Sequence, residues 1–250
     1  MTSALPELPA GFVPARIEVA RVAVHVLARA RSQAVGRIGL VTAPDGIATP
    51  AFGPHASVVR LTPTTLVVDR AGDSTVVPLT GATLRRLAEA AGADVDVPLD
   101  VGTDTPPLGD HDAPLDLDPD VIALLGGWFA LGWAVLDAVG GSEAALAPAR
   151  TQLWPEHVDV GTNVAVGPGP GDRVNLGASA GDGFHEAPYL YVGPWDDRRP
   201  GLGGYWNAPF GAVLGWDALR SAPDPWAEAV AFLVDGVRRC QTVPGVPSAP

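Results

Sequence analysis

The chain has 250 residues with 16 basic and 28 acidic side chains, so its formal net charge is −12. This length suits one large domain or two small ones, and it allows a hydrophobic core without disulfides or a structural metal. The acidity argues against nucleic acid or an anionic membrane as a partner, because phosphate repels a negative surface. Cys240 is the only cysteine, and the first 16 residues contain no apolar stretch typical of a secretory signal. We therefore expect a soluble protein of the reducing cytoplasm.

The first part of the chain is predicted to contain a helix, four strands and a second helix. Residues 16–31 show the helical period, with apolar Ile17, Ala20, Val24, Leu27 and Ala28 on one face and polar Glu18, Arg21, His25 and Arg29 on the other. Runs rich in β-branched residues predict strands at 37–42, 57–61, 65–70 and 75–79. A short helix over 81–91 then ends at Gly92, because glycine adopts the left-handed conformation that stops a helix.

An acidic, proline-rich stretch separates this part from the rest. Residues 94–120 contain nine Asp, five Pro and no Arg, which predicts a linker at 94–118 that runs over the surface with little regular structure. The uncharged run 121–136 follows, and it predicts a core helix over 119–139 that is capped by Asp118. This run is shorter than the about 20 apolar residues that span a bilayer. We therefore expect this helix to be the most buried one.

The last part is predicted to form four more strands, at 158–166, 173–179, 189–192 and 212–215, and a helix over 225–240. Short turns between neighbouring strands indicate antiparallel pairing. The predicted fold class is therefore α+β, with two antiparallel-sheet halves, each flanked by helices, around a buried central helix. The predicted organisation is an N-terminal half at 1–93, the linker at 94–118, and the central helix with the C-terminal half at 119–250, together one compact unit.

A candidate site lies near His157 and Asp159. Residues two apart on a strand point to the same face, so these two side chains should project together. A His-x-Asp pair with a distant second histidine, here His185, is the ligand set of a 2-His-1-carboxylate metal site. A divalent metal bound by His157, Asp159 and His185 is therefore one interpretation, and a metal-free polar pocket is another.

Aromatic residues concentrate around this candidate site. Nine of the 16 aromatic side chains fall within residues 154–216, and aromatic rings with a few convergent polar groups are typical of small-molecule pockets. The candidate ligand-binding residues are Trp154, Glu156, His157, Asp159, Asp182, His185, Glu186, Tyr189 and Trp195. The favoured function is small-molecule binding in a cleft of the C-terminal half. The alternatives are a metal-dependent enzyme that uses the His-x-Asp…His site and a non-catalytic interaction protein. The sequence assigns no catalytic residue, cofactor, ligand identity or oligomeric state.

Three segments carry a resemblance to a known group of proteins. They are Thr-Gln-Leu-Trp-Pro-Glu-His-Val-Asp at 151–159, Gly-Asp-Gly-Phe-His-Glu-Ala-Pro-Tyr-Leu-Tyr-Val-Gly-Pro-Trp at 181–195 and Trp-Asn-Ala-Pro-Phe-Gly at 206–211. These segments resemble an actinobacterial family of unknown function, and the resemblance covers about residues 150–240. It implies a bacterial cytoplasmic protein and transfers no catalytic residue, because no activity is assigned to that family.

Overall fold

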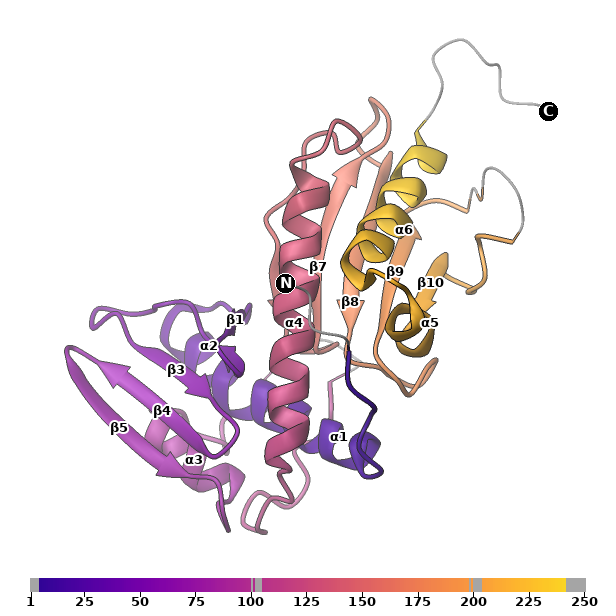
Figure 1. Ribbon diagram of the computed structural model, residues 1–250. Helices are drawn as coiled ribbons and strands as arrows, with labels where there is room; N and C mark the ends of the chain where they lie inside the picture. The colour runs from indigo at the N-terminus through magenta and orange to yellow at the C-terminus, as the bar shows by residue number, and fades with distance from the viewer. Residues whose placement is uncertain (1–4, 100, 102–104, 198, 200–203, 242–250) are drawn as a thin grey trace. The chain divides into compact units, whose positions relative to one another are not determined.

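The computed structural model describes residues 5–99, 101, 105–197, 199 and 204–241, which form an α+β fold with two antiparallel five-stranded sheets (Figure 1). This confirms the predicted fold class. The chain divides into two compact units. Residues 7–130 and 152–159 form what we call the N-terminal unit, and residues 1–6, 131–151 and 160–250 form the C-terminal unit. The domain boundaries expected at residues 93 and 118 stay a prediction.

The N-terminal unit begins with a helical stretch and continues into the first sheet. Its elements are α1 (Phe12–Val22), the π-helix η1 (Ala23–Ala28), α2 (Arg29–Val35), β1 (Val41–Ala43), β2 (Gly46–Ala48), β3 (Val58–Leu61), β4 (Thr65–Arg70), β5 (Asp73–Pro78), α3 (Leu84–Ala91) and the first part of α4 (Pro119–Gly140). The five strands pair in chain order as an antiparallel meander. Of these strands, β2 is the one that the sequence did not predict.

Strand register builds the core face of this first sheet. Val59 lies opposite Val68, and Leu66 pairs with both Leu61 and Val77 across the two neighbouring strands. All five side chains are buried, whereas the residues between them along the strands are more exposed. This alternation is what a strand with one core face requires. Helix α3 begins at Leu84, after its N-cap Thr83, rather than at residue 81 as predicted, and it packs against β4, β5 and η1.

The first helix is longer and more deeply buried than its periodicity indicates. Helical structure runs from Phe12 to Val35, and every residue from 22 to 30 is buried, including His25 and Arg29. Ile17, which was expected on the core face, is exposed. The predicted division into a core face and a solvent face is therefore wrong. The polar side does exist, but the acidic segment after α3 covers it.

That acidic segment contains neither helix nor strand in its described residues, 94–99, 101 and 105–118, as its composition predicts. It is nevertheless attached to the unit at several points. Leu115 donates its backbone N–H to Ala82, and Arg85 of α3 forms ion pairs with Asp96 and Asp112. The fold therefore brings Arg85 next to aspartates that lie far from any arginine in the sequence.

Helix α4 begins as predicted but is not fully buried. The Asp118 carboxylate accepts hydrogen bonds from the N–H groups of Asp120 and Val121, which confirms the predicted cap. Along one side of the helix, however, Gly127, Ala130 and Ala134 are exposed. The expectation that α4 is the most buried helix is therefore wrong, because glycine and alanine on one side have little apolar surface to hide. By length and composition α4 could cross a membrane, and half of its most apolar stretch is buried within the protein.

The second sheet has the strand order β10-β9-β8-β7-β6. Its strands are β6 (Gln152–Trp154), β7 (Asp159–Ala165), β8 (Arg173–Ser179), β9 (Tyr189–Pro194) and β10 (Ala212–Gly215), and α5 (Trp216–Ser221) and α6 (Pro225–Cys240) follow. β8, β10 and α6 have the predicted bounds, whereas β6 and α5 were not expected. Asp224 caps α6 as typical for an aspartate before proline, accepting from the Ala227 N–H.

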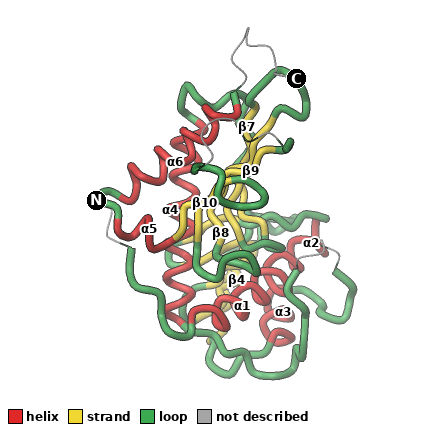
Figure 2. Tube along the Cα trace, turned by 90° about the vertical axis from the view of Figure 1, so that its right-hand side faces the viewer, coloured by secondary structure: helices red, strands yellow, loops and turns green. Residues whose placement is uncertain are grey.

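Helices cover one face of this second sheet in the C-terminal unit (Figure 2). On α6, the position that a Cβ of Gly236 would take is 2.7 Å from Val192 of β9. On α4, a Cβ of Gly132 would be 2.5 Å from the Cβ of Ala178 of β8. Both helices thus approach the sheet through glycine, and they contact the face that carries Ala178 and Val192. The opposite face carries Gly177 and Tyr191, since side chains alternate along a strand.

A similar close approach fixes α4 within the N-terminal unit. A Cβ added to Gly126 would lie 2.3 Å from the backbone nitrogen of Gly46 and 2.6 Å from the carbonyl carbon of Asp45. These atoms belong to the β1–β2 turn, in which Asp45 adopts a left-handed conformation with φ of 55°. The next residue, Gly127, has nothing within 4 Å of its would-be Cβ. Two adjacent glycines of one helix therefore face opposite constraints.

We expect these glycines to respond oppositely to alanine. Gly126→Ala should lower the free energy of unfolding by about 1–3 kcal/mol, because backbone atoms of the turn must move to make room. Gly127→Ala should raise it by about 0.5–1 kcal/mol, because alanine is the better helix former and meets no neighbour. Urea unfolding of both variants beside the wild type measures the difference. Equal effects of the two substitutions would contradict the close approach of α4 to the β1–β2 turn.

Candidate functional site

The nine candidate ligand-binding residues divide between the two compact units. Trp154, Glu156, His157 and Asp159 belong to the N-terminal unit, and Asp182, His185, Glu186, Tyr189 and Trp195 belong to the C-terminal unit. The division matters for the chemistry, because each group has its own geometry. The side chains of the first group do not converge as expected, whereas most side chains of the second group lie close together.

His157 and Asp159 do not share a strand face. His157 is exposed in the turn at 155–158, and β7 begins only at Asp159, which is buried. Val158 lies between them in the left-handed region with φ of 48°, so the chain changes direction exactly where a continuous strand was expected. This conformation is rare for a β-branched residue, and the sequence gives no sign of it. The predicted strand over 158–166 is therefore one residue shorter at its start, and the prediction of a shared face is wrong.

No group of three or more His, Cys, Asp or Glu side chains in the described part of the chain has an arrangement that could hold a metal ion. Trp154 ends β6 as an exposed side chain, and Glu156 lies in the same turn as His157. Nothing in the described residues thus favours the metal-dependent alternative over a metal-free surface.

In the C-terminal unit, Asp182 organises the loop between β8 and β9. Its Oδ1 accepts hydrogen bonds from the N–H groups of Phe184 and His185, and its Oδ2 accepts one of 2.6 Å from the Tyr189 hydroxyl. The Asp182 N–H in turn donates to the carbonyl oxygen of His185. Hydrogen bonds to an ionised carboxylate are stronger than neutral ones. Asp182 therefore holds the loop in shape, and both of its oxygens are already occupied.

The same loop fixes the protonation of His185. Its Nδ1 lies 2.9 Å from the carbonyl oxygen of Ala187, which can only accept, so in the neutral ring Nδ1 carries the proton. Nε2 is then the acceptor. A Cβ on Gly215 would lie 3.7 Å from Nε2, and the ring stands edge-on to Tyr189 with 5.7 Å between centroids. A half-buried histidine thus offers one lone pair beside aromatic rings.

Four aromatic rings form a continuous series, which we call the aromatic row. It consists of Phe210, Phe184, Tyr189 and Tyr191, with centroid separations of 5.1, 6.2 and 6.3 Å between successive rings. All three contacts are edge-to-face, the arrangement that aromatic quadrupoles prefer. The row belongs to the sheet face opposite the helices, because Tyr189 and Tyr191 share that face.

Gly177 makes room for Tyr191, the last ring of the aromatic row. Gly177 is paired with Tyr191, and a Cβ on Gly177 would lie 2.3 Å from the Tyr191 hydroxyl oxygen. The tyrosine ring therefore lies flat over the neighbouring strand. On the same face, Asn175 accepts a hydrogen bond of 2.7 Å from the indole N–H of Trp195. Trp195 is thereby held at the Tyr191 end of the row.

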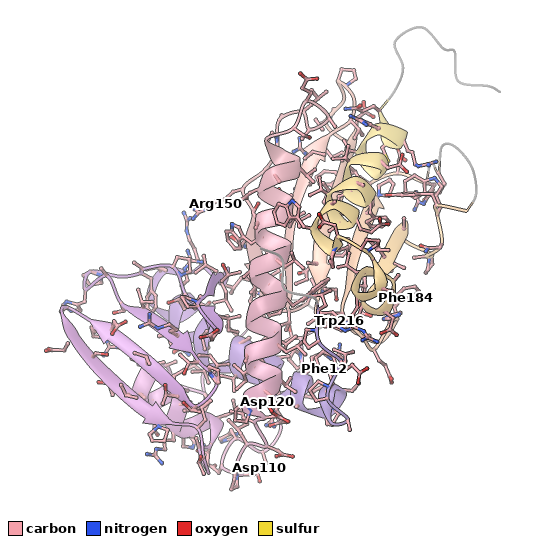
Figure 3. All side chains as sticks on the ribbon, in the orientation of Figure 1. Phe12, Asp110, Asp120, Arg150, Phe184 and Trp216 are labelled. Carbon is pink, nitrogen blue, oxygen red and sulfur yellow. The ribbon has the colours of Figure 1, made fainter. Side chains whose placement is uncertain are left out.

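Much of this aromatic surface faces water. Phe184 is 45% exposed, Trp195 51% and Phe210 36%, whereas Tyr189 is buried beneath them. Phe184 lies beside the start of α5 (Figure 3), where the Trp216 N–H donates to Pro188 of the same loop. Single exposed apolar residues are ordinary, but a contiguous group held by hydrogen bonds is typical of an interaction surface.

Three residues of this surface were missed by the sequence interpretation: Phe184, Tyr191 and Phe210. The sequence already indicates that Tyr191 shares a strand face with Tyr189, although Tyr191 was not among the candidates. Phe184 lies next to the candidate His185 and carries no separate signal. Phe210 reaches the row from a loop 26 residues further along the chain, and no local pattern predicts such a contact.

Comparison of the chain with models of known protein families, with curated proteins and with solved structures gives no match. The assignment of a function therefore rests on the geometry of the aromatic row and its loop.

The loop geometry predicts unequal roles for two carboxylates four residues apart. Asp182→Ala removes the acceptor of three hydrogen bonds and should lower the free energy of unfolding by about 2–3 kcal/mol. Glu186→Ala, at an exposed position of the same loop, should change it by less than about 0.5 kcal/mol. Chemical unfolding monitored by tryptophan fluorescence gives both values. A tolerated Asp182→Ala substitution would show that the aspartate does not hold the loop.

Proposed function

We propose that the C-terminal unit binds a small organic molecule on the aromatic row. The observation that carries the proposal is the contiguous exposure of Phe184 and Phe210 next to His185, whose Nε2 is an acceptor. A ligand with a flat apolar face would stack on the rings, and its hydroxyl or amine hydrogen would be donated to Nε2. Hydroxyl-rich or cationic molecules have both features.

The loop makes this surface ready for binding before a ligand arrives. Asp182 fixes the backbone of Phe184 and His185, and Tyr189 beneath them is tied to the same carboxylate. Binding to groups that are already ordered costs less conformational entropy than binding to mobile side chains. The fixed loop therefore supports recognition rather than simple burial of the rings.

The Glu186 carboxylate favours the cationic members of this ligand class, whereas Arg199, which donates to the Phe210 carbonyl oxygen, places a positive charge at the Phe210 end of the row. Glu186 is exposed on the loop that carries Phe184, and the whole chain has a net charge of −12. A cation over an aromatic face gains about 0.5–2 kcal/mol, and a nearby carboxylate adds attraction. Anionic metabolites would meet repulsion at the same position.

The cellular setting is part of this proposal. The resemblance to an actinobacterial family, together with the single cysteine, supports a bacterial protein that works in the reducing cytoplasm. Small-molecule binding is compatible with either a binding protein or an enzyme. The exposed rings and the loop ordered by Asp182 are what support binding.

Binding should depend on the aromatic row and on Trp195 beside it, and not on exposed apolar residues elsewhere in the chain. We expect Phe184→Ala and Trp195→Ala each to raise the dissociation constant of a bound compound about tenfold, since each ring contributes about 1–2 kcal/mol. Val76→Ser, at an exposed apolar position on β5, is the matched control and should bind as the wild type does. Thermal-shift screening of sugars, nucleosides and quaternary ammonium compounds finds the ligand, and calorimetry measures its affinity.

Two outcomes would overturn this function. Compounds that bind equally well to the wild type and to the Phe184→Ala variant would place the site elsewhere. A protein partner that binds through Phe184 and Trp195, with no small molecule retained, would replace ligand binding by an interaction function.

A further inference from the structure

Four polar side chains of the first helix attach it to the acidic segment. They are Arg21, His25, Arg29 and Gln33, spaced four residues apart, and we call them the polar ladder. Each one forms hydrogen bonds to backbone groups of the segment. Their partners are the carbonyl oxygens of Leu108 and Asp110 for Arg21, Pro106 for His25, Asp94 and Val97 for Arg29, and Asp94 for Gln33.

The π-helix η1 keeps the ladder in a straight line. In an α-helix with 3.6 residues per turn, side chains four apart drift by about 40° around the axis. A π turn contains more than four residues, so it rotates such side chains the other way. Because η1 (Ala23–Ala28) lies in the middle of the ladder, it offsets the drift of the flanking α1 and α2. One row of side chains can then follow one extended segment.

The surroundings of His25 allow only one arrangement of its protons. Its Nε2 lies 2.7 Å from the carbonyl oxygen of Pro106, which can only accept, so Nε2 carries a proton. Its Nδ1 lies 3.5 Å from a nitrogen of Arg29, which can only donate, so Nδ1 must be unprotonated. A second proton would therefore place an N–H against a guanidinium group in a buried position.

The positive charges around His25 also disfavour a second proton on its ring. Burial lowers its pKa most, the Pro106 hydrogen bond raises it, and the positive charges of Arg29 and Arg21 lower it further. The Glu18 carboxylate is already paired with Arg21, and Asp94 and Asp96 act on Arg29.

Helix α3, which packs against η1, does not supply a counter-charge to His25. Of its charged residues, Arg85 pairs with Asp96 and Asp112, while Arg86 and Glu89 are exposed.

We propose that His25 is a proton-sensitive latch, whose protonation releases residues 105–107 of the acidic segment from the first helix, while Arg21 keeps its hydrogen bonds to the carbonyl oxygens of Leu108 and Asp110. Once the segment moves away, water can solvate the charged ring and screen it from the positive charge of Arg29. The closed form binds the proton less readily than the open form, so acid favours opening. The stabilisation from the closed latch is complete above the ordinary histidine pKa of about 6.5 and decreases as the pH falls below it.

Other contacts limit the opening to these residues. Arg85 holds Asp96 and Asp112 through ion pairs, and Gln33 holds Asp94 through two hydrogen bonds. None of these contacts involves His25, although the Nε2 of His111 also lies in the cluster of Arg85, Asp96 and Asp112. The latch therefore acts on a short stretch between fixed points and does not unfold the unit. This inference is independent of ligand binding in the C-terminal unit.

Hydrogen exchange tests the latch in the full chain. After correction for intrinsic exchange rates, the protection of the Thr105 and Leu108 amides, which flank Pro106 and Pro107, should decrease about fivefold between pH 6.5 and 5.5, because the open form gains the proton. In His25→Gln the amide can still donate to Pro106 and accept from Arg29, but it cannot titrate, so its protection should not change with pH. His55→Gln, at an exposed turn, should keep the wild-type response.

The decisive comparison is between the wild type and His25→Gln. Equal pH dependence in these two proteins would overturn the latch. Nitrogen NMR of the wild type provides an independent measurement should His25→Gln not fold. A His25 ring protonated at Nε2, whose titration coincides with the loss of protection, supports the proposal, and a ring that gains its proton without any loss of protection overturns it.

Discussion

The buried stretch 22–30 of the first helix carries a histidine and an arginine, and these must obtain hydrogen-bond acceptors from elsewhere in the chain. Burying such a group without partners costs several kcal/mol, and a cation more. Within the N-terminal unit, the acidic segment supplies these acceptors as main-chain carbonyl oxygens, to His25 and Arg29 above all. Because the described part of the segment forms neither helix nor strand, its carbonyl groups are available to these side chains. The segment therefore stays irregular and yet is firmly attached, which explains how a proline-rich stretch can cover a core helix.

The elements that follow from the sequence are those specified by local chemistry. An aspartate before a proline predicts the start of α4 and of α6, and alternating or β-branched runs predict β8 and β10 with their bounds. Contacts between distant residues are different. The polar face of the first helix was read as solvent-facing, because nothing near residues 21–29 indicates that residues 94–110 will cover it. The short strands β2 and β6, each of three residues, are too brief to show a period.

The candidate site shows the same difference between what local sequence specifies and what it does not. His185, Tyr189 and Asp182 lie in one loop and the strand after it, so their proximity follows from short spacing along the chain. His157 and Asp159 are closer in sequence, but their relation depends on the backbone conformation of Val158, which a side-chain pattern does not reveal. Residues two positions apart share a face only where the strand is continuous.

The two carboxylates of the β8–β9 loop show why composition alone does not identify a binding group. Asp182 and Glu186 have the same charge and flank the same histidine, and both were equal candidates to contact a ligand. In the structure Asp182 accepts from two main-chain N–H groups and a tyrosine hydroxyl, so it supports the residues that would contact the ligand. Glu186 is exposed and remains oriented toward solvent, where a cation could reach it. A carboxylate that is saturated with protein donors shapes a site, whereas an exposed one can act on what binds there. Hydrogen-bond accounting thus separates the two roles, and it makes the aromatic rings and His185, rather than Asp182, the chemical identity of the surface.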